Sequence, residues 1–411
     1  MGARARGTSR SRLREQALDT ALAVAVDARY DVAVLGAGAA GLAAAIAAAE
    51  AGASVVALER DLECGRTILA TGNGRCNFSN AELSPERYND PAFVKAVCGE
   101  HFGEDVLAFF RGCGLAWAQE DERLYPLSRQ ATSVRDVLVG RARHAGATLA
   151  CAREVTGLEK GDDGSAWRVS WRDASAGFAT GTLDARAVVL ACGGGPSLAD
   201  ELGLERAPYE PVLCSLACDA IGNANLAALD GRRAHVVARL LRDGRVLARE
   251  RGEVLFRAYG ISGIVTFDLS RAARPGDVVS LDLTCGLDAT RARELVERAG
   301  GTSGLLDPRI AAALGAAPSE QLERARDLRF VVRGPAGPER AQLTRGGLLV
   351  SQFDATTLEG HKAPGLFACG ESLNVDGACG GFNLAWAWKS GLVAGSGAAA
   401  RAQGKEGPCS R

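Results

Sequence analysis

Eighteen consecutive residues without a charge lie between Asp31 and Glu50, in the stretch DVAVLGAGAAGLAAAIAAAE. This length reaches the lower limit for a helix that spans a membrane. The composition argues against a span, because the stretch is mostly Ala and Gly, and the glycines at positions 36, 38 and 41 would weaken a continuous helix. No belt of aromatic residues flanks it. We therefore expect no membrane partner from this stretch.

The same stretch matches a strand, a GxGxxG turn and a helix. Val32, Val34 and Leu35 predict a short buried strand, and Leu42 to Ala51 predicts an alanine-rich helix. In such a turn the first glycine permits the tight bend and the second lets a pyrophosphate approach the backbone, while the third lets the helix pack closely on the strand. The N-terminus of the helix then offers its N–H groups to the anion.

A second apolar strand, Ser54 to Leu58, ends at Glu59, eighteen residues beyond Gly41. An acid at this distance is well placed to accept hydrogen bonds from ribose hydroxyls. Together the turn and the acid predict a dinucleotide site. The alternative is an ordinary strand–helix–strand unit with a glycine-rich turn.

The composition narrows the class of function. The 411 residues carry a formal net charge of −1, so no global field attracts nucleic acid or anionic lipid. Twelve cysteines are scattered without a metal-binding spacing and only four histidines are present, so we expect no metal site. With no recognisable signal peptide, the cysteines are typical of reduced thiols, which predicts a cytoplasmic protein.

The order of the predicted elements indicates an α/β protein whose first domain is interrupted. Residues 1–28 form an arginine-rich tail that we expect to be disordered. A Rossmann-like domain is predicted over 29–200 and 340–402, with a small β-sheet near 148–185. The block 205–335 does not alternate strand and helix, which predicts an inserted β-rich and helical domain with its own core.

Three local patterns add detail to this organisation. A helical stretch is expected over 91–112, because Val94, Val97, Val106 and Phe109 recur at helical spacing. Asp243-Gly244 between two apolar runs predicts a β-hairpin. A long helix is expected after Gly380-Gly381, near the end of the chain.

Four segments are more specific together than any one alone. They are VAVLGAGAAGLAAA at the first turn, GRTILATGNGRCNFSN at 65–80, LYPLSRQA at 124–131 and GLFACGESLNVDGACGGFNLAWAWKSG at 365–391. In these segments the chain resembles the YhiN/BaiN-like family of FAD-dependent oxidoreductases, in the family's order and over nearly the whole chain after Arg29. The last segment is the most specific, because it matches the family pattern GE-x-x-x-V-D-G-x-x-GG-[YF]-N-L-x-W-A-x-x-SG almost residue for residue.

The resemblance implies FAD as the cofactor, with its pyrophosphate at the first helix. It places the ribityl chain near Glu371, and the flavin N1/O2 edge at the backbone of Asn383 and Leu384, where a helix dipole can stabilise negative charge. The loop 71–77 resembles the family's flavin-contacting loop, with Arg75 as a fixed charge; the alternative is a surface loop in which Arg75 only caps a neighbour. The residues expected to contact the cofactor are Gly36, Gly38, Ala40, Gly41, Glu59, Arg60, Arg66, Gly72, Asn73, Gly74, Arg75, Cys76, Asn77, Gly370, Glu371, Gly381, Asn383 and Leu384.

The chain departs from the family within the inserted block. The family carries F-T-H-x-G-[IL]-S-G-P there, whereas residues 256–264 of this chain are FRAYGISGI, without the Thr, the His and the Pro. A proton donor carried over from the family's histidine is therefore missing. Tyr259 is the first candidate for that role and Tyr125 the second; for each, a packed aromatic residue is the alternative.

Three functions stay open at this point. Family members are associated with reduction of activated double bonds, with amine oxidation and with reduction of uridine in ribosomal RNA. The first hypothesis is flavin hydride chemistry on a small molecule, with NAD(P)H as a transient donor because the chain has one dinucleotide fingerprint. The second makes ribosomal RNA the substrate, since residues 232–257 hold eight arginines and three acids. The third is a non-catalytic flavin-binding scaffold, which the missing Thr and His motivate.

Overall fold

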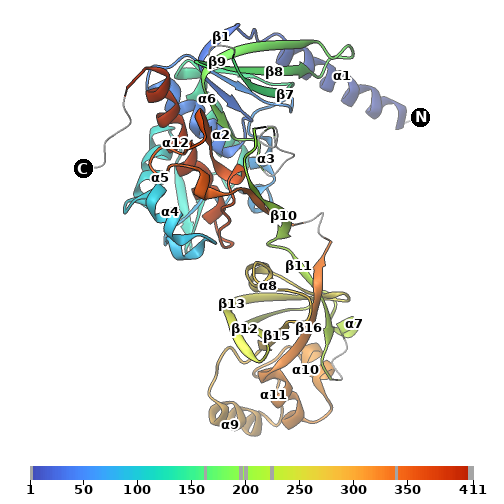
Figure 1. Ribbon diagram of the computed structural model, residues 1–411. Coiled ribbons are helices and arrows are strands. Elements are labelled where there is room, and N and C mark those ends of the chain that lie inside the picture. Colours follow the sequence, from blue (N-terminus) through green and yellow to red (C-terminus); the bar gives the residue numbers. More distant parts are fainter. Residues whose placement is uncertain are drawn as a thin grey trace. The chain divides into compact units, whose positions relative to one another are not determined.

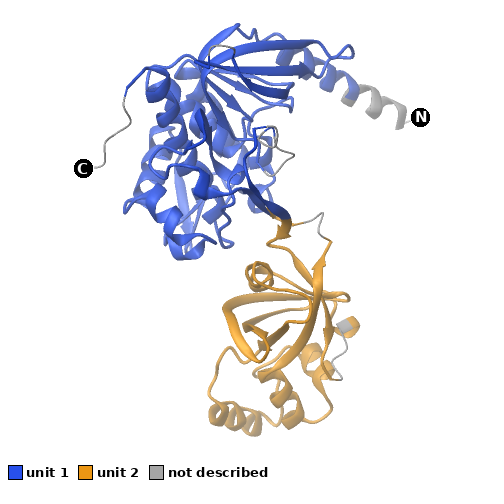
Figure 2. Ribbon diagram, in the orientation of Figure 1, with its two compact units in different colours: residues 1–209, 345–411 blue, residues 210–344 orange. Residues whose placement is uncertain are grey.

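The computed structural model describes residues 3–161, 164–193, 198, 202–222, 226–337 and 341–405. The chain divides into two compact units (Figure 2), with unit 1 formed by 1–209 and 345–411 and unit 2 by Glu210–Thr344. The sequence places the insertion at 205–335, so the observed unit begins five residues later and ends nine residues later. The expected boundaries at residues 200 and 340 lie outside the described residues.

The sheet of unit 1 has eight strands, and its main path runs in the order β18-β19-β9-β1-β2-β6. The central strand β1 (Arg29–Leu35) pairs in parallel with β2 (Val55–Leu58) on one side and with β9 (Thr180–Leu190) on the other. The side chains of β1 from Val32 to Leu35 are completely buried. Such continuous apolar strands are typical of parallel sheets covered on both faces. The further strands of this path are β6 (Thr148–Ala150), β18 (Glu359–Gly360) and β19 (Ala363–Ala368).

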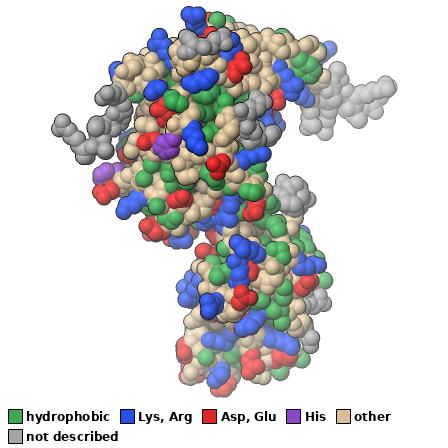
Figure 3. All heavy atoms as spheres, in the orientation of Figure 1, with side chains coloured by type: hydrophobic (Ala, Val, Ile, Leu, Met, Phe, Trp, Pro, Cys, Tyr) green, Lys and Arg blue, Asp and Glu red, His purple; other side chains and the backbone are tan. Residues whose placement is uncertain are grey.

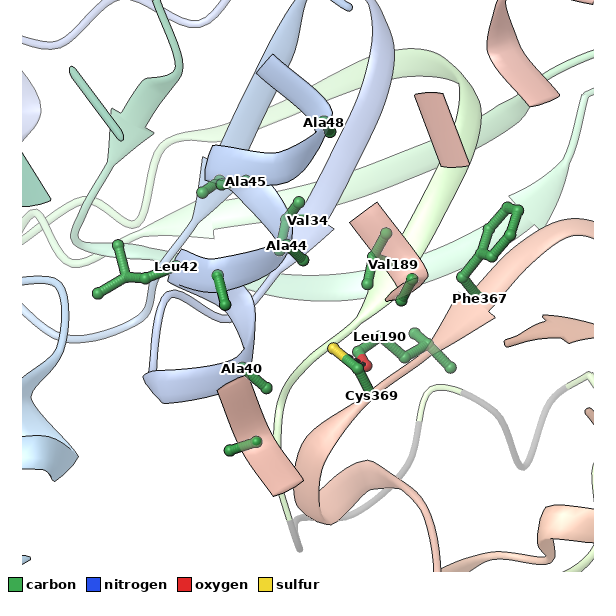
Figure 4. Close-up of a cluster of buried hydrophobic side chains, with 14 of the residues drawn as sticks. Val34, Ala40, Leu42, Ala44, Ala45, Ala48, Val189, Leu190, Phe367 and Cys369 are labelled. Carbon is green, nitrogen blue, oxygen red and sulfur yellow. Dashed lines mark hydrogen bonds between the residues drawn. The ribbon is translucent and has the colours of Figure 1, made fainter. Parts of the chain in front are cut away.

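Helices α2 (Ala39–Glu50) and α12 (Phe382–Ala402) pack against each other in backbone contact. A Cβ atom at Gly391 would lie 2.4 Å from the carbonyl oxygen of Ala40, and one at Gly395 would lie 2.2 Å from that of Ala44. Only glycine at these two positions lets the helices approach so closely. Figure 4 shows the apolar cluster that this packing covers, in which α2 side chains face Val189 and Leu190 of β9.

The small β-sheet predicted near 148–185 is not a separate sheet. Strands β7 (Arg153–Lys160) and β8 (Trp167–Asp173) form an antiparallel pair, and β8 continues into the main sheet through β9. The reason is that β9 is one strand of 11 residues, which pairs with β8 and, farther along, with β1. The sequence analysis had ended the small sheet near residue 185, within this strand, where the charged residues Asp184 and Arg186 interrupt the apolar run.

The helical stretch expected over 91–112 is two helices, α4 (Pro91–Cys98) and α5 (Phe102–Gly112). Gly99 ends α4 with a φ of +69°, a backbone conformation that favours glycine. A three-stranded sheet lies in the same unit, with the order β3-β5-β4. Its strands and the remaining helical elements of unit 1 are β3 (Ser79–Asn80), β4 (Trp117–Glu120), β5 (Arg123–Pro126), α3 (Arg66–Leu69), α6 (Ala131–His144), and short 3₁₀ turns at Thr71–Gly74, Pro85–Arg87, Val350–Gln352 and Gly370–Ser372.

The disordered tail predicted for residues 1–28 is wrong over most of its length. The structure forms helix α1 from Ala3 to Leu22, which Figure 1 shows leading to the N-terminus. Ala, Arg, Leu, Glu and Gln dominate this segment, and all are good helix formers. The prediction weighed the charge of the tail and not its helix propensity.

Unit 2 is a closed barrel of six antiparallel strands with helices outside it (Figure 1). The barrel order is β11-β14-β13-β12-β15-β16, and the aromatic rings of Phe256 and Phe330 lie in its core. The predicted hairpin is confirmed: Asp243 and Gly244, with φ of +49° and +75°, join β12 (Arg233–Arg242) to β13 (Arg245–Arg257). The other elements are β11 (Ser215–Ala220), β14 (Gly260–Ser262), β15 (Val278–Asp282), β16 (Leu328–Ala336), α7 (Leu226–Leu229), α8 (Ile264–Ser270), α9 (Ala289–Ala299), α10 (Pro308–Leu314) and α11 (Pro318–Arg326).

The chain leaves unit 1 along β10 (Arg206–Val212) and returns along β17 (Leu343–Leu348), and these two strands pair with each other. No helix within the described ranges combines the length and the apolar composition that crossing a bilayer requires.

The parallel sheet of unit 1 and the barrel of unit 2 confirm the predicted α/β architecture with a β-rich and helical insertion.

Candidate functional site

The turn between β1 and α2 shows a different spatial constraint at each of its three glycines. Gly36 has a φ of +96°, and a Cβ there would lie 2.6 Å from the carbonyl oxygen of Ala191. A Cβ at Gly41 would lie 1.9 Å from the carbonyl oxygen of Gly36, so helix and turn touch. At Gly38 the nearest atom to a Cβ is Oγ1 of Thr67, at an ordinary 3.4 Å. The fold itself thus requires glycine at 36 and 41, whereas position 38 has room for a bound group.

The N-terminus of α2 carries no capping side chain at Gly38, and Ala40 lies in its first turn. The preceding amide, that of Ala37, donates to Oε2 of Glu59 at 2.8 Å. The second oxygen of Glu59 accepts from the amide of Asp61 at 3.0 Å. Because each carboxylate oxygen has two lone pairs, Glu59 can still accept from ribose hydroxyls while it holds the turn.

Two arginines expected near the adenosine end lie at the surface. Arg66 pairs with Asp61 at 2.9 Å, and its side chain is 69% exposed. Arg60 is exposed as well. Their positions follow Glu59 along the chain, and their part in holding a cofactor stays a prediction.

The loop 71–77 adopts left-handed backbone conformations at three consecutive residues. The φ angles of Gly72, Asn73 and Gly74 are +56°, +55° and +83°. Asparagine tolerates this region better than most residues, which explains its place between two glycines. Cys76 is completely buried, and burial raises the pKa of its thiol to about 11, so it packs as a neutral group.

Asn77, at the end of this loop, has a buried Oδ1 atom without a hydrogen-bond partner among the described residues. A buried acceptor of this kind is costly unless another group donates to it. A bound cofactor with N–H or hydroxyl donors would satisfy it. The loop therefore offers a ligand both accessible backbone and an unused acceptor.

Arg75 contacts two side chains of the three-stranded sheet. Its guanidinium lies 4.8 Å from the ring centroid of Tyr125, and its Nη1 lies 3.7 Å from Oε2 of Glu120. Arg129 lies over the same ring at 5.2 Å and pairs with the same Glu120 at 3.0 Å. Two guanidinium groups thus share one carboxylate, which leaves a net positive charge beside the loop.

Glu371 lies in the 3₁₀ turn that follows β19. Its side chain is exposed at one side. The protein atoms around the carboxyl remove part of its hydration, which raises its pKa to about 7. A Cβ at Gly193, three residues beyond the end of β9, would lie 3.9 Å from the Oε2 atom of Glu371. The preceding Gly370 is fixed from α12, because its amide donates to Oγ of Ser390 at 2.9 Å.

The N-terminus of α12 also lacks a capping side chain, at Gly381. The side chain of Asn383 is engaged elsewhere: its Oδ1 accepts from the amide of Gly377 at 2.7 Å, and its Nδ2 donates to the carbonyl of the same residue at 2.9 Å. Asn383 and the half-buried Leu384 therefore offer a ligand their backbone amides in the first turn of the helix.

Two residues that the sequence analysis missed hold this helix start. Nδ2 of Asn80 donates to the carbonyl of Gly380 at 2.9 Å, and the hydroxyl of Tyr88 donates to the carbonyl of Phe382 at 2.7 Å. Asp376 was missed as well; it is 1% exposed and forms a bidentate pair with Arg345, at 2.7 and 3.1 Å. The V-D-G signature was the only sequence signal for Asp376, and Asn80 lies at the end of the GRTILATGNGRCNFSN segment.

The two candidate proton donors lie in different units. Tyr125, on β5 in unit 1, is 4% exposed and lies under the two guanidinium groups. Tyr259 lies between β13 and β14 in unit 2, is 41% exposed and has Arg257 at 5.8 Å from its ring centroid. The described residues hold no group of three or more His, Cys, Asp or Glu that could bind a metal ion.

These features fit a flavin dinucleotide: an open space at Gly38, an unused acceptor at Asn77, an accessible carboxylate at Glu371 and two uncapped helix N-termini. The fold and the site define a flavoprotein oxidoreductase with a Rossmann FAD-binding domain. The family described as HI0933-like protein Rossmann domain matches residues 30–397. The chain belongs to this family of FAD-dependent oxidoreductases.

Individual relatives extend over the same length. A 3-dehydro-bile acid delta(4,6)-reductase of Clostridium scindens is 31% identical over 417 residues, covering 90% of this chain and 99% of the relative. A ribosomal RNA dihydrouridine synthase of Escherichia coli is 26% identical over 397 residues, covering 88% and 96%. Among solved structures, a 3-ketosteroid-delta4-(5alpha)-dehydrogenase from Rhodococcus jostii RHA1 matches with 19% identity and a TM-score of 0.49, covering 92% of this chain and 98% of its own.

Proposed function

We propose that this protein reduces an activated C=C bond in a small molecule, with NAD(P)H as the electron donor to FAD. The observation that carries the proposal is the end-to-end similarity to the bile acid reductase, which includes 99% of that relative. When bound, FAD supplies the hydride for such a reduction. The residues of the chain then have to hold the cofactor, balance its charge and deliver a proton.

Each of the two helix N-termini would stabilise a different negative charge of the cofactor. That of α2, with room at Gly38, would face the pyrophosphate, and that of α12 would face the N1/O2 edge of the flavin. Glu371 would bind the ribityl chain. Because its carboxyl has a pKa of about 7, it can both donate to and accept from a hydroxyl near neutral pH.

Tyr125 is the proton donor that the geometry of unit 1 supports. Its ring lies against Arg75, which belongs to the loop proposed to contact the flavin. Tyr259 remains the alternative, and the two are separable by substitution. Phenylalanine at the donor position would lower the rate of substrate reduction while leaving reduction of the flavin by NAD(P)H unchanged, since only the reduction of the C=C bond needs a proton from the tyrosine.

A second candidate is reduction of uridine in ribosomal RNA, which the 26% identical relative supports. The arginine-rich hairpin of unit 2 would be the RNA contact, and Arg245, Arg249 and Arg251 are exposed on it. Other arginines there are neutralised, because Arg242 pairs with Asp277 at 2.9 Å and Arg257 with Asp230 at 3.1 Å. On the face of this unit that Figure 3 shows, acidic and basic side chains are interspersed, which favours a small-molecule substrate over a polyanion.

The experiment begins with the cofactor. Heat extraction of the purified protein, followed by mass spectrometry, should identify FAD and not FMN. Stopped-flow reduction by NADH and by NADPH then names the donor, and each reduced sample is mixed without oxygen with a carboxylated 3-oxo-Δ4 steroid or with a ribosomal RNA fragment. Flavin reoxidation and a product heavier by two hydrogens with the steroid support the proposal. Reoxidation by RNA alone would support reduction of uridine in ribosomal RNA instead. No turnover with any donor and acceptor would indicate a non-catalytic flavin-binding scaffold.

A further inference from the structure

Two cysteines far apart in the sequence lie in contact at the adenosine end of the site. Cys64 follows β2 in the loop before α3, and Cys151 follows β6 directly. Their sulfur atoms are 3.2 Å apart. Neither cysteine has a role in the flavin site described above. The sequence analysis had treated all twelve cysteines as scattered thiols.

The backbone around both cysteines holds them in register. The amide of Glu59 donates to the carbonyl of Ala150 at 3.0 Å, the amide of Ala152 to that of Asp61 at 2.8 Å, and the amide of Arg153 to that of Glu59 at 2.8 Å. A disulfide has its sulfurs about 2.05 Å apart, so they need to approach by roughly 1 Å.

The two thiols differ in a way that suits sequential reaction. Cys151 is half-buried whereas Cys64 is 5% exposed. Either sulfur can donate the hydrogen bond between the two thiols. When Cys64 donates it, this bond lowers the pKa of Cys151, and Arg143 acts in the same direction, against burial and the nearby Glu59. The same bond, with burial, raises the pKa of Cys64. An accessible nucleophile beside a buried resolving thiol is the arrangement used in thiol–disulfide exchange.

We propose that Cys64 and Cys151 are a thiol–disulfide exchange site for low-molecular-weight disulfides, and that their bond secures the turn that holds the adenosine side of FAD. The Cys151 thiolate attacks one sulfur of the disulfide RSSR, which forms a mixed disulfide and releases one RS⁻ that takes up a proton. Cys64 then loses its proton and attacks the Cys151 sulfur, which releases the second RSH. Two protein thiols are oxidised by two electrons, and RSSR is reduced to two RSH.

The link from this bond to the cofactor is short. Gly65, next to Cys64, donates its amide to the carbonyl of Ala37 in the glycine turn at 2.8 Å. The amide of Ala37 in turn donates to Glu59 at 2.8 Å. A bond between Cys64 and Cys151 restrains both sides of this connection, so the turn opens less often and FAD leaves more slowly.

The test uses the complete flavoprotein treated with glutathione disulfide or with reduced glutathione. Oxidation should lower the thiol count under denaturing conditions from twelve to ten, and peptide mapping should recover a Cys64–Cys151 cross-link. Dissociation of FAD, followed by flavin fluorescence after dilution, should slow by roughly three- to tenfold, because a rigid binding loop has a smaller ordering cost. Addition of dithiothreitol should restore both values.

Cys151→Ser should abolish the cross-link and the change in FAD release, and Cys64→Ala provides a second variant for the buried position. Cys113→Ser is the matched control, since Cys113 is a partly buried cysteine at the C-terminus of α5 and its removal should leave both effects intact. A thiol count that stays at twelve in the folded wild type overturns the exchange site. A cross-link that forms without slowing FAD release overturns its coupling to the turn.

Discussion

The N-termini of α2 and α12, which we propose face the flavin, are formed in different ways. At α2 the bend is formed mainly by neighbours in sequence, because Gly41 lies against the carbonyl of Gly36, although Gly36 also lies against the distant Ala191. At α12 the start is built from distant segments, because Asn80 and Tyr88 hold the carbonyls of Gly380 and Phe382. Both helices begin without a capping side chain. The comparison shows that a helix N-terminus suited to an anion can be formed by residues close in sequence or by contacts between distant segments.

The largest effects are expected within the α2 turn, where two glycines should separate fold from cofactor. Gly41→Val should prevent folding, because its Cβ would lie 1.9 Å from a carbonyl oxygen; the expected loss exceeds about 4 kcal/mol. Gly38→Val should fold normally and lose FAD, since only the ligand needs that space; we expect at least roughly tenfold weaker retention, or about 1.4 kcal/mol. Circular dichroism and the flavin-to-protein absorbance ratio measure the two effects. Normal flavin content in Gly38→Val would show that the pyrophosphate does not bind at this turn.

Glu371, in the 3₁₀ turn that follows β19, should have the next largest effect. Loss of its hydrogen bond in Glu371→Ala should cost about 1.5 to 3 kcal/mol of FAD binding, or roughly one to two decades in affinity. Glu371→Gln keeps an acceptor oxygen and should lose less. Titration of the deflavinated proteins with FAD, followed by fluorescence quenching, gives the three affinities. If they are equal, the carboxylate does not contact the cofactor.

A smaller effect is expected for the distant support of α12. Tyr88→Phe removes the hydroxyl that donates to Phe382 and should lower the free energy of unfolding by about 0.5 to 1.5 kcal/mol. Because the helix start then moves more freely, FAD affinity should fall by roughly two- to fivefold. Tyr30→Phe is the control, since the Tyr30 hydroxyl accepts from the amide of Asp27, away from α12. Equal FAD affinities in the two variants would show that Tyr88 acts on stability alone.

The smallest effect concerns pH in the deflavinated protein. The carboxyl of Glu371 has a pKa of about 7 in the folded chain against an ordinary value of 4.5, so the folded state binds more protons between these values. Its contribution to stability is therefore complete below pH 4.5 and declines as pH rises through about 7. Melting temperatures of wild type should fall more steeply than those of Glu371→Gln from pH 5 to pH 8. Parallel curves would contradict the raised pKa.

The parts of the site predicted from sequence are those in which a short segment constrains itself. The GxGxxG turn, Glu59 at the end of the next strand and the hairpin at Asp243-Gly244 each depend on backbone conformations and spacings within about 20 residues. The positions of Asn77 and Glu371 could be assigned only through resemblance to a family, because nothing in their own neighbourhood requires a ligand.

The sequence by itself determined the α/β class, the glycine turn and the presence of an insertion, since periodicity and glycine sterics act over neighbouring residues. Only the tertiary structure decided that β9 is one strand, that Asn80 and Tyr88 support α12, and that Cys64 meets Cys151. The physical reason is that these contacts join segments 87 to 300 residues apart, such as Cys64 with Cys151 and Asn80 with Gly380. Chain entropy favours no such pair until the sheet and its two packed helices have formed.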